Sequence, residues 1–546
     1  MATLLEPSFP EDPAREELER WIETTQSMSL LRFITCGSVD DGKSTLIGRL
    51  LYDSKLLLED QLSALTSDSR KHGTQGEGLD FALLVDGLSA EREQGITIDV
   101  AYRFFATEKR KFIVADTPGH EQYTRNMVTG ASTADLAVIL VDARKGILTQ
   151  TRRHSFLVHL LGIRNIVLAV NKMDLVGYDE SVFHRIVGDY EAFASSAGIN
   201  LFTAIPLSGL EGDNIAHRSE RMQWFQGQSL LEHLESVPAG HRQEADGHFR
   251  MAVQWVSRPD YTFRGYAGRI ASGRLRRDDP VVILPSGRRT TIERIIVGGH
   301  DLLEARAGQS VMLTFTDEID CSRGDVVVWA GAVPDITTRI DASLVWMSES
   351  ELIPHRAYWL KIGSQTISAR IDKVRCVIDV NSFDERANAK IGLNDVGRVV
   401  IDLDRPIPAL RYAHNRKLGG FILIDTLTKA TVAGGLIDGF PAAPKLASQE
   451  PPRTIRWIMG QRRSTWAAQA AERLRAQGHR VVILDHAALV AFGAADLTRV
   501  ARQAAHLLAE AGAIVLVTLG AAPEEAYPGT CIDSETDPNA GEEWVI

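Results

Sequence analysis

The chain has 546 residues, and at about 150 residues per domain this length predicts three or four domains. A content of 44% hydrophobic and 24% charged residues is ordinary for a globular protein and excludes a disordered or fibrous chain. The 60 basic and 71 acidic residues give a net charge of −11, so no overall positive field draws the chain to nucleic acid or to anionic lipid.

The N-terminal residues, the hydropathy and the cysteines indicate the compartment. Residues 1–30 hold seven acids and two bases, so we expect an acidic arm rather than a signal peptide. No apolar run approaches the roughly 20 residues that cross a bilayer, which predicts no membrane association. Four cysteines lie far apart, without a CxxC pair or a histidine cluster: Cys36, Cys321, Cys376 and Cys531. Reduced thiols and a cytoplasmic protein are therefore expected.

Residues 31–240 alternate short apolar runs with segments of helical length, such as Gln150–Leu161. Runs of this kind are strands buried on both faces, which predicts a parallel sheet covered by helices on both sides. The predicted strands are Leu31–Cys36, Phe112–Ala115, Leu136–Val141, Ile166–Val170 and Phe202–Leu207.

A glycine-rich loop follows the first strand and precedes a predicted helix over Thr45–Leu51. Its sequence fits GxxxxGK[ST], in which glycines let backbone N–H groups surround a phosphate and the helix N-terminus adds a favourable dipole. Lys43 is expected to bridge the β- and γ-phosphates, and Ser44 to bind Mg²⁺. The candidate binding residues are Gly37, Ser38, Val39, Asp40, Asp41, Gly42, Lys43, Ser44 and Thr45.

A second motif, Asp116-Thr117-Pro118-Gly119-His120, follows the strand Phe112–Ala115. An aspartate at the carboxyl end of a strand in such a sheet is placed to hold Mg²⁺ through a water, and Gly119 to offer its N–H to the γ-phosphate. His120 is the candidate catalytic residue that orients the attacking water. Between the two motifs, in the segment Glu91–Ile98, Thr97 is the candidate switch threonine, with its hydroxyl on Mg²⁺.

Base recognition is predicted at Asn171-Lys172-Met173-Asp174, which closes the strand Ile166–Val170. A carboxylate at Asp174 accepts from both N1–H and the exocyclic amine of guanine, and adenine has no such pair of donors. Ser208-Gly209 is placed for a backbone N–H to meet guanine O6. The three motifs together predict GTP and Mg²⁺ rather than ATP.

From about Phe249 the helical periods fade, and short strand-like runs recur between Gly, Asp and Pro turns. Such spacing predicts two all-β barrels, over residues 245–335 and 336–440. The clearest runs are Gly268–Gly273, Asp278–Pro285, Gly308–Phe315, Gly324–Trp329, Tyr358–Ile362, Arg370–Val380, Arg398–Leu403 and Gly420–Thr426.

Residues 441–452 contain four prolines and predict an extended linker. Residues 453–546 return to a βαβαβ pattern with strands Thr454–Met459, Arg480–Leu484 and Ala513–Leu519 and helices Thr465–Gln477 and Asp496–Ala511. The last 25 or so residues, rich in proline, glycine and acids, are expected to fray. The fold class is therefore a multidomain α/β and all-β protein, with a C-terminal α/β domain.

The strings GSVDDGKST, EREQGITID, DTPGHEQYTRNM and NKMD resemble translation-factor-type GTPases, in which two β-barrels follow the GTPase domain. GSVDDGKSTLIGRLLYDS, ADLAVILVDARKGILTQTRRHSF and SRPDYTFRGYAGRIASG look like the GTPase subunit of bacterial sulfate adenylyltransferase. This resemblance, from about Leu30 to Ile437, implies a heteromer with a separate catalytic subunit. That subunit makes adenosine 5′-phosphosulfate (APS) and pyrophosphate from ATP and sulfate, a nucleotidyl transfer driven by GTP hydrolysis.

The C-terminal pattern resembles the core of the APS kinase domain that bifunctional members of this family carry, but it departs from it. After the first strand the chain reads Gly460-Gln461-Arg462-Arg463-Ser464-Thr465, so the phosphate loop is shortened by about three residues and Arg463 replaces its lysine. The second strand ends in Asp485-His486, and about 27 residues after the third strand leave no room for a lid. We expect a folded, truncated, degenerate kinase-like domain without activity, which is either a neutral remnant or a scaffold for self-association.

Two alternatives remain open. An elongation-factor-like GTPase would carry aminoacyl-tRNA, but nothing in this sequence extends a basic face for RNA, and such carriers lack the proline linker and the α/β tail. A signalling-type GTPase is disfavoured by the two β-barrels. Co-purification with an adenylyltransferase-like partner, with aminoacyl-tRNA or with neither separates the three readings.

Overall fold

The structure is a computed structural model. It describes residues 28–54, 59–72, 79–85, 97, 99–238, 247–260, 263–379, 383–387, 390–441, 455–476, 480–490, 500–501, 504–505, 508, 514–519 and 531–533. The chain forms two compact units, Met1–Pro441 and Ala442–Ile546. Among the described residues no helix is long and apolar enough to cross a membrane. The proline-rich segment 442–452 and almost all of the acidic arm lie outside the described residues.

The first unit begins with a six-stranded sheet in the order β2-β3-β1-β4-β5-β6. All neighbours are parallel except β2, which runs antiparallel to β3 at one edge. The predicted parallel strands are confirmed, but β2 was not predicted from the sequence. The bounds are β1 Leu30–Cys36, β2 Ala101–Ala106, β3 Lys111–Asp116, β4 Leu136–Asp142, β5 Asn165–Asn171 and β6 Thr203–Pro206.

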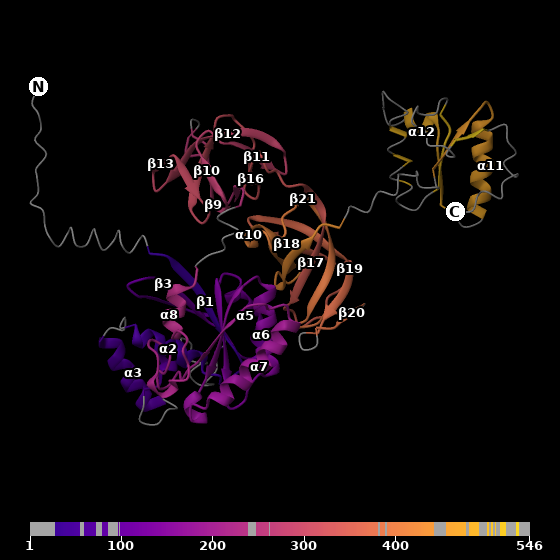
Figure 1. Cartoon of the computed structure of the whole chain (residues 1–546). Helices are drawn as coiled ribbons and strands as arrows, with labels where there is room; N and C mark the ends of the chain where they lie inside the picture. Colours follow the sequence, from indigo (N-terminus) through magenta and orange to yellow (C-terminus); the bar gives the residue numbers. More distant parts are fainter. Residues whose placement is uncertain are drawn as a thin grey trace, which may run out of the picture. The chain divides into compact units, whose positions relative to one another are not determined.

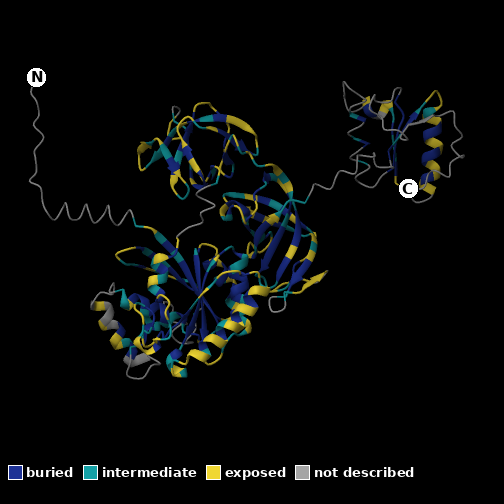
Figure 2. Ribbon diagram, in the orientation of Figure 1, coloured by how far each residue is buried: buried dark blue, intermediate teal, exposed yellow. Residues whose placement is uncertain are grey.

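Helices cover both faces of this sheet, with α2 and α8 on one side and α5, α6 and α7 on the other (Figure 1). The central strands are dark blue in Figure 2 because every residue of β4 is buried, as expected for a strand covered on both faces. The α-helices are α2 Lys43–Asp53, α3 Glu59–His72, α5 Thr124–Ala131, α6 Thr149–Leu160, α7 Glu180–Ser196 and α8 Leu230–Ser236. The 3-10 turns are η1 Phe81–Leu84, η2 Glu121–Tyr123, η3 Met173–Val176 and η4 Glu220–Met222.

The first β-barrel has the strand order β11-β16-β7-β9-β15-β12-β13, with an additional pairing of β11 with β12 that closes the ring. Its apolar core is separate from that of the sheet and includes Phe249, Ile270, Ile283, Leu313 and Val327. The strands are β7 Arg250–Ala252, β8 Trp255–Ser257, β9 Gly265–Ser272, β10 Arg274–Arg276, β11 Pro280–Leu284, β12 Arg288–Val297, β13 His300–Leu302, β14 Glu304–Arg306, β15 Ser310–Phe315 and β16 Val326–Trp329.

The second β-barrel has the order β18-β22-β23-β17-β21-β19-β20, and the pairing of β18 with β19 closes it. Both predicted barrels are therefore confirmed. The elements are β17 Ile336–Trp346, β18 Ala357–Ile362, β19 Gln365–Ile378, β20 Glu385–Ala387, β21 Val396–Pro408, α10 Arg416–Gly419, β22 Gly420–Asp425 and β23 Thr431–Gly439.

The second barrel packs on the face of the sheet that α5, α6 and α7 cover. Val345, Val396 and Leu436 of the barrel belong to the same buried apolar cluster as these helices. The Tyr412 hydroxyl donates to the carbonyl of Leu161, just after α6, at 2.9 Å. These contacts fix the barrel against the helices that flank the candidate site.

The second unit is a parallel sheet in the order β25-β26-β24-β27. Its elements are β24 Ile455–Met459, α11 Arg463–Ala476, β25 Val481–Leu484, α12 His486–Val490, β26 Ile514–Val517 and β27 Cys531–Asp533. The predicted helix over Asp496–Ala511 lies partly outside the described residues, and those that are described there are helical. The expectation that the last 25 residues fray is wrong for β27, since Trp457↔Cys531 and Met459↔Asp533 pair in parallel.

Candidate nucleotide-binding site

The glycine-rich loop leaves the carboxyl end of the central strand β1 and enters α2. Gly37 and Gly42 have φ values of 155° and 88°, and a Cβ at Gly42 would lie 2.6 Å from the Asn171 side-chain nitrogen. Only glycine tolerates both the conformation and the close approach. The loop is fixed from inside, because the Ser38 N–H donates to the Asp41 carboxylate at 2.6 Å. Burial raises the pKa of Asp41 to about 6, against the opposing effect of Lys43.

Lys43 begins α2 and is buried within the loop that precedes it. Its ammonium donates to the Ser38 carbonyl at 2.8 Å. Burial lowers the pKa of Lys43, and the nearby carboxylates of Asp116 and Asp41 act in the opposite direction. The loop thus encloses a cation beside its backbone, which suits it to the phosphates of a nucleotide. Among the remaining loop candidates, Val39 and Thr45 are half-buried and Asp40 is exposed.

Four oxygen-bearing side chains meet next to Lys43. The Ser44 hydroxyl donates to Asp116 Oδ2 at 2.6 Å and lies 3.3 Å from the Thr97 hydroxyl. The Thr35 hydroxyl donates to the other Asp116 oxygen at 3.2 Å. The structure therefore brings together the three residues predicted to hold Mg²⁺, although the rest of Glu91–Ile98 lies outside the described residues. A hard cation with oxygen ligands suits this set of side chains.

The segment Asp116–His120 continues from β3 across the glycine-rich loop. Thr117 is buried and its hydroxyl donates to the Thr35 carbonyl at 2.6 Å, while Pro118 is buried beside it. A Cβ at Gly119 would lie 2.6 Å from Lys43 Nζ and 2.9 Å from the backbone nitrogen of Val39, so this backbone directly faces the loop. His120 is exposed, and its Nδ1 accepts from the Gln122 N–H at 3.3 Å.

Asn171 joins the base-recognition segments to the glycine-rich loop. This side chain is only 2% exposed. Its amide donates to the Asp41 carbonyl at 2.7 Å, and its oxygen accepts from the N–H groups of Lys172 at 2.8 Å and Gly209 at 2.9 Å. One buried amide therefore fixes three segments that are distant in the sequence.

The residues after Asn171 are held around this amide. Met173 is buried and its N–H donates to the Leu207 carbonyl at 3.2 Å, which sets Ser208 beside the segment. Asp174 is half-buried at the start of η3. The four candidate segments for phosphates, Mg²⁺ and base thus converge at the carboxyl ends of β1, β3, β5 and β6, where open α/β sheets bind ligands.

The motifs did not reveal Asp142, which lies at the end of β4. This carboxylate is fully buried, accepts from Arg144 at 2.7 Å and lies 3.1 Å from Lys172 Nζ. Burial alone would raise the pKa of Asp142, but the hydrogen bonds from Arg144 and Lys172 prevail and lower it. Lys172 also donates to the Asp40 carbonyl, so its ammonium connects β4 to the loop. Asp142 directly follows the predicted strand Leu136–Val141, and this position was the signal in the sequence that could have identified it.

Comparisons with known proteins agree with this arrangement. The family of the elongation factor Tu GTP-binding domain matches residues 28–240, and that of the GTP-eEF1A C-terminal domain-like module matches residues 339–438. Sulfate adenylyltransferase subunit 1 of Aeromonas salmonicida is 51% identical over 80% of this chain and 92% of its own length. The bifunctional enzyme CysN/CysC of Xylella fastidiosa is 49% identical over 91% of this chain and 84% of its own. The bifunctional enzyme NodQ of a Rhizobium species is 47% identical over 93% of this chain and 82% of its own. The chain therefore belongs to the sulfate adenylyltransferase subunit 1 family, whose N-terminal part is a GTP-binding domain of the elongation factor Tu type.

Proposed function

We propose that this chain is the GTP-hydrolysing regulatory subunit of sulfate adenylyltransferase in sulfate assimilation. It couples GTP hydrolysis to synthesis of APS from ATP and sulfate by a partner catalytic subunit in the cytoplasm. The observation that carries this proposal is the 51% identity to a subunit 1 relative over nearly all of that protein. The convergence of the phosphate, magnesium and base segments in one site supports it.

Ser44, Thr97 and Asp116 are proposed to hold Mg²⁺, because their oxygens already lie within hydrogen-bonding distance of one another or of a shared partner. When bound, Mg²⁺ supplies charge stabilisation to the phosphate oxygens. Lys43 and the N–H groups of residues 37–45 are proposed to bind the phosphates, and the Gly119 N–H to contact the terminal one. Since Lys43 is buried beside the loop, its charge acts there with little screening by water.

Asp174 is proposed to accept from guanine, with Ser208 and Gly209 at its O6, because Asn171 holds both segments against the phosphate loop. His120 is proposed to orient the attacking water. It follows Gly119, whose backbone faces Lys43, and its ring is exposed, with Nδ1 accepting from the Gln122 N–H.

We assign the domains as an N-terminal arm (1–30), a GTPase domain (31–240), two barrels (245–335 and 336–440), a linker (441–452) and a kinase-like domain (453–546). The division of the chain after Pro441 supports the boundary between the second barrel and the linker.

The C-terminal unit is proposed to be inactive as an APS kinase. Two relatives are named bifunctional enzymes, and their similarity extends into this unit. Against a second activity here stands the loop between β24 and α11: β24 ends at Met459 and α11 begins at Arg463, which leaves three residues. Between β1, ending at Cys36, and α2, beginning at Lys43, there are six. Three residues are too few to turn successive N–H groups toward a phosphate.

Two experiments test these proposals. Co-expression with a catalytic adenylyltransferase subunit should yield a stable heteromer, whereas recovery of aminoacyl-tRNA instead would favour the carrier alternative. Incubation of the full chain with ATP, Mg²⁺ and APS should form no 3′-phospho-APS. Formation of this product by the full chain, and its loss when residues 453–546 are deleted, would overturn the inactive assignment. If the same deletion lowers the number of subunits in the oligomer, the C-terminal unit is a scaffold.

A further inference from the structure

His154 lies on α6, outside the phosphate, magnesium and base motifs, and is completely buried. Its Nδ1 accepts from the N–H of Gly37, the first residue of the phosphate loop, at 3.2 Å. Its other ring nitrogen lies 3.0 Å from the Gln150 side-chain amide on the same helix. The ring is therefore engaged at both nitrogens.

The N–H of Gly37 needs this acceptor because it lies just beyond the strand ladder. The register of β1 with β4 ends at Cys36↔Ile139, and that with β3 ends at Thr35↔Asp116. Gly37 is buried, so water does not replace the missing strand partner. A buried N–H without an acceptor is unfavourable enough to displace the backbone that carries it.

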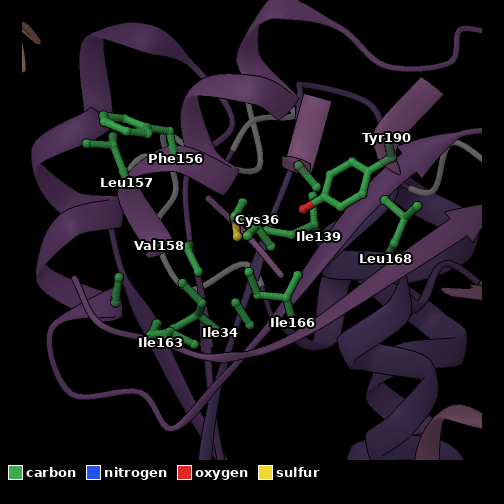
Figure 3. Close-up of a cluster of buried hydrophobic side chains, with 14 of the residues drawn as sticks. Ile34, Cys36, Ile139, Phe156, Leu157, Val158, Ile163, Ile166, Leu168 and Tyr190 are labelled. Carbon is green, nitrogen blue, oxygen red and sulfur yellow. The ribbon is translucent and has the colours of Figure 1, made fainter. Parts of the chain in front are cut away.

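Helix α6 holds His154 rigidly. Two to four residues after it, Phe156, Leu157 and Val158 lie in the apolar cluster of Figure 3, which also contains Cys36, the residue before the phosphate loop. The preceding residue, Arg153, forms an ion pair at 2.5 Å with Glu121, next to His120. One turn of α6 thus contacts both loops that face the proposed phosphates.

Only the neutral imidazole can serve as the acceptor. Burial, together with the charges of Lys43 and Arg153, lowers the pKa of His154 to about 3. The lone pair of Nδ1 then accepts from Gly37, and Nε2 carries the proton. Because an amide nitrogen cannot accept, Gln150 accepts from Nε2 through its side-chain oxygen, with the amide turned by 180° about its last bond. A protonated ring would present an N–H to an N–H and break the contact.

We propose that His154 is a positioning residue for the GTP site, in which its Nδ1 anchors Gly37 so that the N–H groups of the loop converge on the phosphates. This inference rests on the proposed function, which places the phosphates in that loop. The proposal is specific to one atom, because the hydrogen-bond acceptor for the Gly37 N–H must lie at the position of Nδ1 and not elsewhere on the ring.

Three substitutions of His154 distinguish the two roles that this side chain could have, namely a hydrogen-bond acceptor for Gly37 and a residue that only fills the core. Asparagine places an oxygen where Nδ1 lies, glutamine places one nearer to Nε2, and leucine has no acceptor. We expect His154→Asn to bind fluorescent GTP and GDP within about 3-fold of wild type, and His154→Gln and His154→Leu to bind both at least about 10-fold more weakly. The exposed His184→Leu on α7 is the control and should bind like wild type.

A core-filling role predicts the opposite order, with leucine tolerated best because it preserves apolar volume. Equal affinities of the asparagine and glutamine variants would also overturn the inference, even if the leucine variant did not fold. If wild type binds no guanine nucleotide, the proposed function fails as well. If wild type binds and the order of variants is reversed, only the role of His154 fails.

Discussion

Replacing Asn171 by alanine should disconnect the base-recognition segments from the phosphate loop. The substitution removes three hydrogen bonds and leaves the Asp41 carbonyl and the Gly209 N–H without their buried partner. At about 1–3 kcal/mol for each of these two unsatisfied buried groups, the combined loss is about 2–6 kcal/mol. If this energy holds the loops in the conformation that binds nucleotide, affinity for GTP should fall at least about 30-fold and up to about 20,000-fold.

Two measurements check this expectation, namely titration with fluorescent GTP and hydrogen exchange of the amides around Asp41 and Gly209. Exchange is preferred to global unfolding because a chain with several domains does not unfold in one step. Asn200→Ala, at an exposed position after α7, is the matched control. Affinity of Asn171→Ala within about 3-fold of that control, with unchanged exchange, would refute the idea that this amide organises the site.

Three further expectations follow from the site. Asp174→Asn exchanges an acceptor for a donor and should weaken GTP at least about a hundredfold while improving xanthosine triphosphate, because two charge-assisted hydrogen bonds are lost; unchanged GTP affinity would remove this assignment. Lys43→Ala should abolish tight triphosphate binding, whereas His120→Ala should bind nearly normally and hydrolyse slowly; equal losses of binding would make His120 structural. Since the folded-state pKa of His154, about 3, lies below its ordinary 6.5, its contribution to stability is complete above pH 6.5 and declines as the pH falls toward 3. Between pH 7 and 5 this contribution should decline by ~2 kcal/mol. Protection of the amides around Gly37 against hydrogen exchange, corrected for the intrinsic exchange rate, should lack this part of the pH dependence in His154→Asn; identical pH profiles of the variant and wild type would contradict the assignment.

The sequence predicted the parallel strands and the barrels because their apolar runs and turns are local signals. The edge strand β2 was not predicted because one of its sides faces water: Tyr102 is 41% and Phe104 69% exposed, whereas Phe105 is buried. Aromatic residues on a solvated side conceal the alternation that marks a half-buried strand. The three-residue strand β27 was not predicted because its partner β24 is distant in the sequence and the residues that flank β27 in the sequence are typical of loops.

Motifs likewise identified the candidate residues of the site but not the contacts that arrange them. Asn171 was recognised for its place in NKMD, although its bonds to Asp41 and Gly209 depend on segments that meet only in the folded chain. His154 lies in one of the strings that resemble the family, but no role was assigned to it, because a single histidine on a helix is usually an ordinary core or surface residue. Its significance arises from the position of α6 against the end of β1.

The most direct test of the central claim measures sulfate-dependent pyrophosphate release by the chain together with its catalytic partner, with and without GTP. The account predicts that GTP stimulates release, that hydrolysis of GTP depends on the same components, and that Lys43→Ala abolishes the stimulation without preventing assembly. Pyrophosphate release that is equal with and without GTP, or unaffected by Lys43→Ala, would contradict it.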